Sequence, residues 1–114
     1  MADFTSVRGW LELDDRMLPA VREVIGSASV GWVVPEESTG WGRYAFFGAD
    51  VRTTRLGQTR DQLAALAAIR EEDGEFTDFV EGIFYVDDVT GDPPPQVWEL
   101  KGGRLYERPR STAV

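Results

Sequence analysis

The residues of this chain that could do chemistry are nine carboxylates between Glu71 and Asp92, a stretch that contains no Lys or Arg. The chain has 20 acidic and 12 basic residues and a net charge of -8, so the rest of it holds 11 acids and 12 bases, a net of +1. The charge imbalance is confined to these 22 consecutive residues. A field of one sign attracts cations and basic surfaces and repels phosphate.

Several readings of these carboxylates remain open. On a strand, alternate residues lie about 6.6 to 6.8 Å apart on one face, so the acids could imitate phosphates to a nucleic-acid-binding protein. They could equally form a solubilising face. Oxygen ligands suit Ca²⁺ or Mg²⁺, but neither Asp73-x-Glu75-x-x-Asp78 nor Asp87-Asp88 with Asp92 matches an EF-hand loop. Paired carboxylates could hydrolyse glycosides, although 114 residues leave little room for a deep substrate cleft.

Composition narrows the classes of function further. The chain has no Cys and no His, which excludes disulfides, thiolate nucleophiles, zinc-thiolate sites and Ser-His pairs. We therefore predict no catalytic residue, no metal and no cofactor. The scattered basic residues argue against direct binding of nucleic acid. No apolar run approaches the ~20 residues of a membrane span, and the N-terminus lacks the features of a signal peptide, so we expect a cytoplasmic protein.

The elements that must position the acids follow from hydrophobic periodicity and turn residues. A capping-box pattern, Thr59-x-x-Gln62, predicts the start of the second helix, and Asp73-Gly74 predicts its end. Gly48 suggests a bulge, Gly102-Gly103 predicts a hairpin turn, and residues 75–81 fit either a short helical turn or a loop. Residues 1–7 read as a loose lead-in. We expect strands at 7–13, 30–35, 43–52, 82–88, 96–100 and 105–108, and helices at about 15–25 and 59–72.

This element order, β-α-β-β-α-β followed by a β-hairpin, predicts a single α+β domain over residues 1–114. We expect a mostly antiparallel sheet with two helices on one face, as in the ferredoxin-like arrangement. The tryptophans divide between core and surface. Trp10, Trp32 and Trp98 fall on expected strands and are predicted to pack in the core, with a preceding Gly giving room to the first two indoles. Trp41 lies in a Gly/Ser/Thr-rich loop and is a candidate contact.

Several motifs together resemble small uncharacterised accessory proteins of bacteria and their phages. They are Gly9-Trp-Leu-Glu-Leu13, Gly31-Trp-x-x-Pro35, the strand from Tyr44 to Arg52, Asp61-Gln62, and Gly82-Ile-Phe-Tyr-Val86 before the Val97-Trp-Glu-Leu100 hairpin. The resemblance covers most of the chain. It implies accessory roles such as immunity proteins and anti-defence inhibitors, and it transfers no functional residues.

We therefore expect a non-catalytic binding module, of inhibitor or immunity type, that covers a basic surface of a partner protein, such as one that handles nucleic acid. The acids should line up on one outward side with no base nearby. An alternative is a structural or self-assembling protein that pairs through the edge of its C-terminal hairpin. The predicted partner-binding residues are Glu71, Glu72, Asp73, Glu75, Asp78, Asp87, Asp88 and Trp41.

Overall fold

The computed structural model describes residues 3–26, 30–37, 42–91 and 94–110. Its elements are β1 (Phe4–Leu13), α1 (Leu18–Ile25), β2 (Trp32–Val33), β3 (Arg43–Arg52), α2 (Leu56–Ala67), β4 (Arg70–Asp73), β5 (Phe76–Phe79), β6 (Glu81–Asp88), β7 (Gln96–Lys101) and β8 (Arg104–Pro109). Short 3-10 turns, η1 (Asp15–Met17) and η2 (Thr53–Arg55), lead into the two helices.

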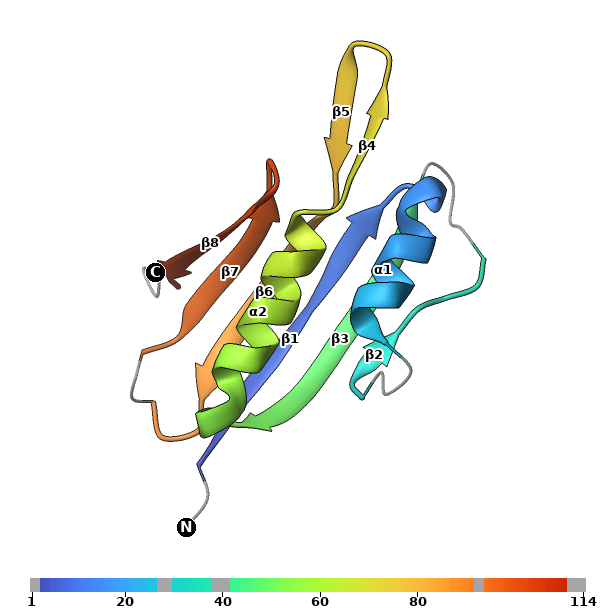
Figure 1. Cartoon of the computed structure of the whole chain (residues 1–114). Coiled ribbons are helices and arrows are strands. Elements are labelled where there is room, and N and C mark those ends of the chain that lie inside the picture. Colours follow the sequence, from blue (N-terminus) through green and yellow to red (C-terminus); the bar gives the residue numbers. More distant parts are fainter. Residues whose placement is uncertain (1–2, 27–29, 38–41, 92–93, 111–114) are drawn as a thin grey trace.

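Six of the strands form one antiparallel sheet in the order β2-β3-β1-β6-β7-β8 (Figure 1). Strand β3 lies between β1 and β2, so β1-α1-β2 is a split βαβ unit, and β6 takes the place of the fourth ferredoxin-like strand. Both helices cover the same face of the sheet. The predicted α+β class, with two helices on one face of an antiparallel sheet, is confirmed.

Alternation along β1 decides which side chains meet the helices. Val7, Leu11 and Leu13 are buried in the core, whereas the residues between them point to the opposite face. Gly9 also faces the core, where an added Cβ would lie 2.8 Å from a ring carbon of Phe84. The room that Gly9 provides is therefore used by Phe84, rather than by the adjacent Trp10 as the sequence suggested.

The second helix differs from its prediction at both ends. It begins at Leu56, so Thr59 lies inside the helix, and Gln62 instead accepts a hydrogen bond from the Trp32 indole N–H at 3.2 Å. It ends at Ala67 because the following residues form β4, which pairs with β5. The acidic residues after Arg70 were expected to continue the helix, but they pair with β5 instead. Residues 75–81, which fitted a helical turn or a loop, instead contain β5.

Two further expectations are wrong. Strand β1 already begins at Phe4, because its pairing with β3 continues to the register Phe4 with Arg52. Gly48 makes no bulge, since it pairs one-to-one with Arg8 in an unbroken ladder. The two-glycine turn is confirmed: Gly102 and Gly103 both have positive φ, 59° and 87°, as a type I′ hairpin requires.

Candidate interaction surface: an acidic arm and the cleft at its base

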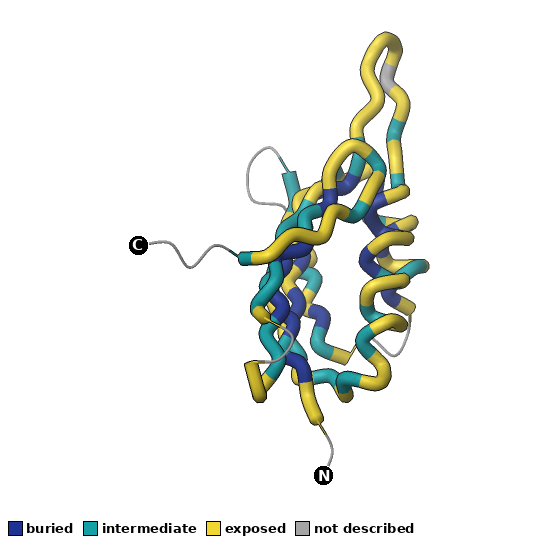
Figure 2. The backbone as a smooth tube through the Cα atoms, turned by 90° about the vertical axis from the view of Figure 1, so that its left-hand side faces the viewer, coloured by how far each residue is buried: buried dark blue, intermediate teal, exposed yellow. Residues whose placement is uncertain are grey.

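Strands β4 and β5 form a separate hairpin, residues 70–79, that projects beyond the end of the large sheet; we call it the acidic arm (Figures 1 and 2). Its two-residue turn starts at Gly74, whose φ of 62° fits the first central position of a type II′ turn. Most of its residues are exposed. The turn at Gly74 therefore makes these residues a narrow projecting hairpin, and they do not form part of the surface of the large sheet.

The base of the arm is held by apolar contacts. Val80, directly after β5, is fully buried, and its N–H donates to the carbonyl of Ile69 at 3.2 Å. The Phe79 ring packs against Gly103 in the β7–β8 turn, where an added Cβ would lie 2.9 Å from it. The arm is thus fixed at one end and exposed along the rest of its length.

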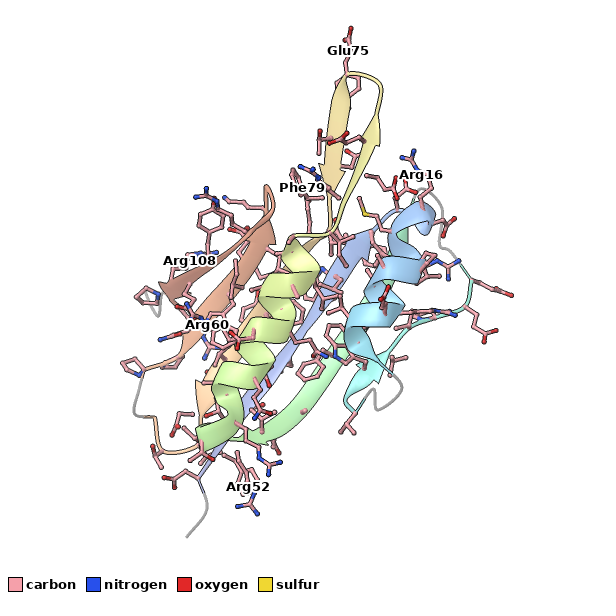
Figure 3. The ribbon with its side chains drawn as sticks, viewed as in Figure 1. Arg16, Arg52, Arg60, Glu75, Phe79 and Arg108 are labelled. Carbon is pink, nitrogen blue, oxygen red and sulfur yellow. The ribbon has the colours of Figure 1, made fainter. Side chains whose placement is uncertain are left out.

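The arm concentrates unpaired negative charge. Glu71 lies directly opposite Asp78 across the two strands, a like-charge pair that opposes strand pairing. Glu75 is in the turn and points away from the body (Figure 3). Among the described residues, none forms an ion pair with Glu71, Glu75 or Asp78. Glu72 has only a 3.8 Å contact with Arg70, with both side chains largely exposed, which adds little stability.

A large apolar side chain stands among these acids. Phe76, the first residue of β5, is 72% exposed. It follows Glu75 in the chain and lies two residues before Asp78, on the same face of the strand. Exposed aromatic side chains of this kind are frequent anchors in protein interfaces.

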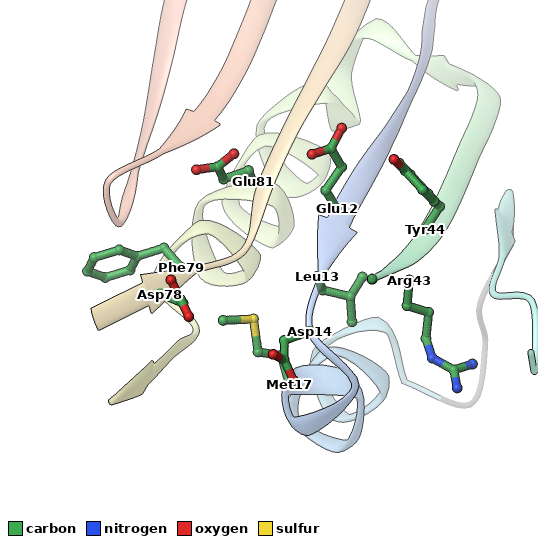
Figure 4. A pocket seen from close by; sticks show the side chains of 10 residues that line it. Glu12, Leu13, Asp14, Met17, Arg43, Tyr44, Asp78, Phe79 and Glu81 are labelled. Atoms are coloured by element: carbon green, nitrogen blue, oxygen red, sulfur yellow. The ribbon is translucent and has the colours of Figure 1, made fainter. Parts of the chain in front are cut away.

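A cleft of about 310 Å³ opens where the arm meets the sheet (Figure 4). On its walls, Glu12 of β1 lies directly opposite Glu81 of β6, so two carboxylates are cross-strand neighbours, and no described residue forms an ion pair with either. Hydrogen bonds from the Arg16 side chain and backbone N–H hold the pKa of a third carboxyl, Asp14, below its ordinary value. The lining residues are Glu12, Leu13, Asp14, Met17, Gly42, Arg43, Tyr44, Asp78, Phe79 and Glu81.

Among the described residues, Arg43 supplies the guanidinium on the cleft wall, and it is already engaged. Arg43 donates from Nε to Asp15 at 2.7 Å and from Nη1 to the carbonyl oxygens of Pro35 and Glu36. The cleft therefore presents carboxylates and the Tyr44 ring to any ligand or partner side chain that enters it. In the described part of the chain, no three acidic side chains converge closely enough to hold a metal ion. Carboxylates that do not converge on one point suit a guanidinium or ammonium group better than a small hard cation.

Asp87 and Asp88 do not belong to this surface. They end β6, six and seven residues along the strand from Glu81, which is roughly 20 and 24 Å. Asp87 forms ion pairs with Arg8 at 3.0 Å and Arg110 at 2.8 Å. The expectation of a single row of acids without bases nearby is therefore wrong for this end, because sheet pairing brings distant arginines beside Asp87.

Asp88 is occupied by hydrogen bonds rather than by an arginine. Both the hydroxyl and the N–H of Thr90 donate to it, and they keep the pKa of this carboxyl below its ordinary value. The hydroxyl of Thr5 also reaches it at 3.4 Å. Asp88 thus closes the turn that follows β6, and its charge is less available to a partner than those on the arm.

The tryptophans differ in burial, and two of the candidate residues are not described. Trp32 and Trp98 are buried, as predicted, with 8% and 2% exposure. Trp10 is not in the core: it is 36% exposed, on the sheet face away from the helices. Trp41 and the side chain of Asp73 lie outside the described residues.

Glu12, Glu81 and Phe76 were not among the predicted contacts. Glu81 and Phe76 lie within the acidic segment, so its pattern could have pointed to them. Glu12 could not be found in this way, because it is 69 positions from Glu81 in the chain and reaches it only through the pairing of β1 with β6.

Comparison of the chain with protein-family models, curated proteins and solved structures finds no match. Neither of the helices in the described ranges is long and apolar enough to cross a membrane.

Proposed function

We propose that this protein is a non-catalytic binding module that inserts its acidic arm into a basic groove or patch of a partner protein, in the manner of an inhibitor or immunity protein. The observation that carries the proposal is the arm itself, a projecting hairpin with unpaired carboxylates at Glu71, Glu75 and Asp78 around the exposed Phe76. The charges would steer association and choose the partner, and the phenyl ring would supply affinity.

The like-charge pair on the arm supports a role in binding. Directly opposite carboxylates destabilise a hairpin, and a base at either position would relieve the repulsion. The same arrangement occurs at the base of the arm, where Glu12 faces Glu81. A basic side chain from a partner would neutralise the Glu71–Asp78 pair, so the repulsion present in the free protein would become attraction in the complex.

A protein partner fits these features better than nucleic acid does. Phosphate groups would be repelled by the arm, whereas arginine-rich surfaces, such as those that bind nucleic acid, would be attracted. The exposed Phe76 gives a protein partner an apolar contact. A partner whose own function is to bind nucleic acid is one that this arm could inhibit.

A defined basic probe tests the proposal. The affinity of a labelled nona-arginine peptide is measured against salt concentration for wild type and for the triple variant Glu71→Lys, Glu75→Lys, Asp78→Lys. We expect the triple variant to bind about tenfold or more weakly, with a flatter salt dependence.

The matched control reverses three exposed acids on other elements, Glu23, Glu37 and Asp61, none of which has an ion pair with a described residue. Both triple variants change the net charge from -8 to -2, because each reversal adds 2. Equal weakening in the two would mean that net charge alone attracts the peptide, and would contradict a role for the arm.

Edge-to-edge self-assembly is the second candidate, and the geometry favours it less. β8 does lie at an edge of the sheet, as this candidate requires. Its exposed residues include Arg104, Glu107, Arg108 and Pro109. Charged side chains and proline on an edge strand are features that oppose pairing with a second strand.

A further inference from the structure

We call the face of the sheet away from the helices the open face (Figure 2). It carries a row of residues that are apolar except for Glu99 on β7. Each residue of the row is the direct cross-strand partner of the next, from β2 across to β8. Phe46 and Trp10, near its middle, are 47% and 36% exposed. No described element covers this row. Its members are Val33, Phe46, Trp10, Ile83, Glu99 and Tyr106.

On the central strands, the residues beside the row are arranged so that the face complements itself. On β1, Arg8 lies one open-face position to one side of Trp10, and Glu12 lies one position to the other side. We propose that two copies of this chain stack their open faces about a twofold axis that runs along the row. Rotation about that axis places each strand over its own copy with the direction reversed, so Arg8 of one protomer meets Glu12 of its partner.

The neighbouring strands fit the same operation. On β3, Gly48 and Tyr44 flank Phe46, so the Tyr44 ring of one protomer lies over the recess at Gly48 of the other, where nothing occupies the space of an added Cβ. On β6, Tyr85 and Glu81 flank Ile83, so each Glu81 carboxylate meets a tyrosine that can donate a hydrogen bond. Three adjacent strands are therefore self-complementary, as an isologous interface requires.

The size of the face is adequate for a stable dimer. The six strands hold 42 residues in total. At about 3.4 Å per residue and about 4.8 Å between strands, they present roughly 700 Å², which lies within the range of about 600 to 1,000 Å² per partner of standard protein interfaces. On β7 and β8 like charges would meet across the axis, because Glu99 faces its own copy and Arg104 faces Arg108 of the other protomer. The contact is accordingly centred on β3, β1 and β6, with β8 at its polar rim.

The oligomeric state of the full chain, measured by sedimentation over a concentration range, tests this inference. Arg8→Glu and Glu12→Arg each place like charges opposite one another, so each alone should weaken the dimer by about tenfold, and the double swap should restore it. Because Arg8 also pairs with Asp87 at 3.0 Å, circular dichroism checks that each variant is folded.

Phe46→Glu supplies a second test that spares this ion pair, with Phe76→Glu as its matched control, since Phe76 is exposed but lies on the arm. Only Phe46→Glu should dissociate the dimer. The inference is overturned if wild type stays monomeric at the highest concentration, if Phe46→Glu remains dimeric, or if the double swap fails to restore what the single swaps lose. Binding of the basic peptide by the arm is measured separately. The absence of a dimer would therefore not contradict the proposed function.

Discussion

The like-charge pair in the arm makes an unusual prediction: Glu71→Lys should stabilise the arm while it weakens binding of a basic probe. Glu71 and Asp78 are direct cross-strand partners, which places their Cβ atoms about 5 Å apart and their charges roughly 6 Å apart. At that separation in water the interaction is about 0.7 kcal/mol, and screening at 0.15 M salt leaves about half. Exchanging repulsion for attraction therefore changes the arm's stability by about 0.6 kcal/mol.

Hydrogen exchange of the β4 and β5 amides is the appropriate assay, because a projecting hairpin can open without unfolding the core. A gain of about 0.6 kcal/mol corresponds to about threefold higher protection in Glu71→Lys. Glu71→Gln, which removes the repulsion and adds no attraction, should give about half the free-energy gain. Amides of α2, such as those of Leu63 and Leu66, serve as the internal reference.

Salt identifies the cause of the effect. In about 1 M salt the screening length falls to about 3 Å, so the difference between variants and wild type should nearly vanish. Protection that is unchanged or lower in Glu71→Lys at low salt would refute the reasoning. It would mean that the two carboxylates do not face each other, and the support that their repulsion gives to a binding role would be lost.

Three further outcomes are expected from the fold. Gly9→Ala should destabilise the protein severely or prevent folding, as seen in urea titration, because the new Cβ would lie 2.0 Å from the carbonyl oxygen of Ile83. Phe84→Ala empties the centre of the core and should lower the free energy of unfolding by about 3 to 5 kcal/mol. Asp88→Asn should reduce stability at neutral pH, and its difference from wild type in urea midpoint should shrink in acid. The reason is that hydrogen bonds from Thr90 lower the folded-state pKa of Asp88, so their stabilisation is present above the ordinary carboxyl pKa and lost as pH falls through the folded value.

Local signals in the chain were sufficient for the fold class and for several elements. The alternating apolar run and its flanking residues gave β3 its observed bounds, Arg43–Arg52, and adjacent glycines gave the β7–β8 turn. The exclusion of thiolate and imidazole chemistry needed composition alone. The excess of acids in residues 71–92 was likewise visible without coordinates.

The boundary between α2 and the acidic arm was harder to predict from the sequence, because the local signals there conflict. Residues Arg70–Asp73 follow a strong helix and carry charges that suit a helix surface, yet they form β4. Their partner, β5, lies in a segment with helical spacing of Phe76, Phe79 and Val80. Only the pairing of the two strands, with Gly74 in a left-handed conformation between them, decides the structure.

By itself the sequence determined that β1 has two faces, that its aromatic and charged residues share one of them, and that the acids outnumber the bases in one stretch. Tertiary structure decided which face the helices cover, so that Trp10 is exposed and Leu11 buried. It also decided which acids meet a base, since Asp87 reaches Arg8 and Arg110 whereas Glu81 meets Glu12. The physical reason is that alternation and charge count are properties of neighbours along the chain, whereas burial and ion pairing depend on the strand order that brings distant segments together.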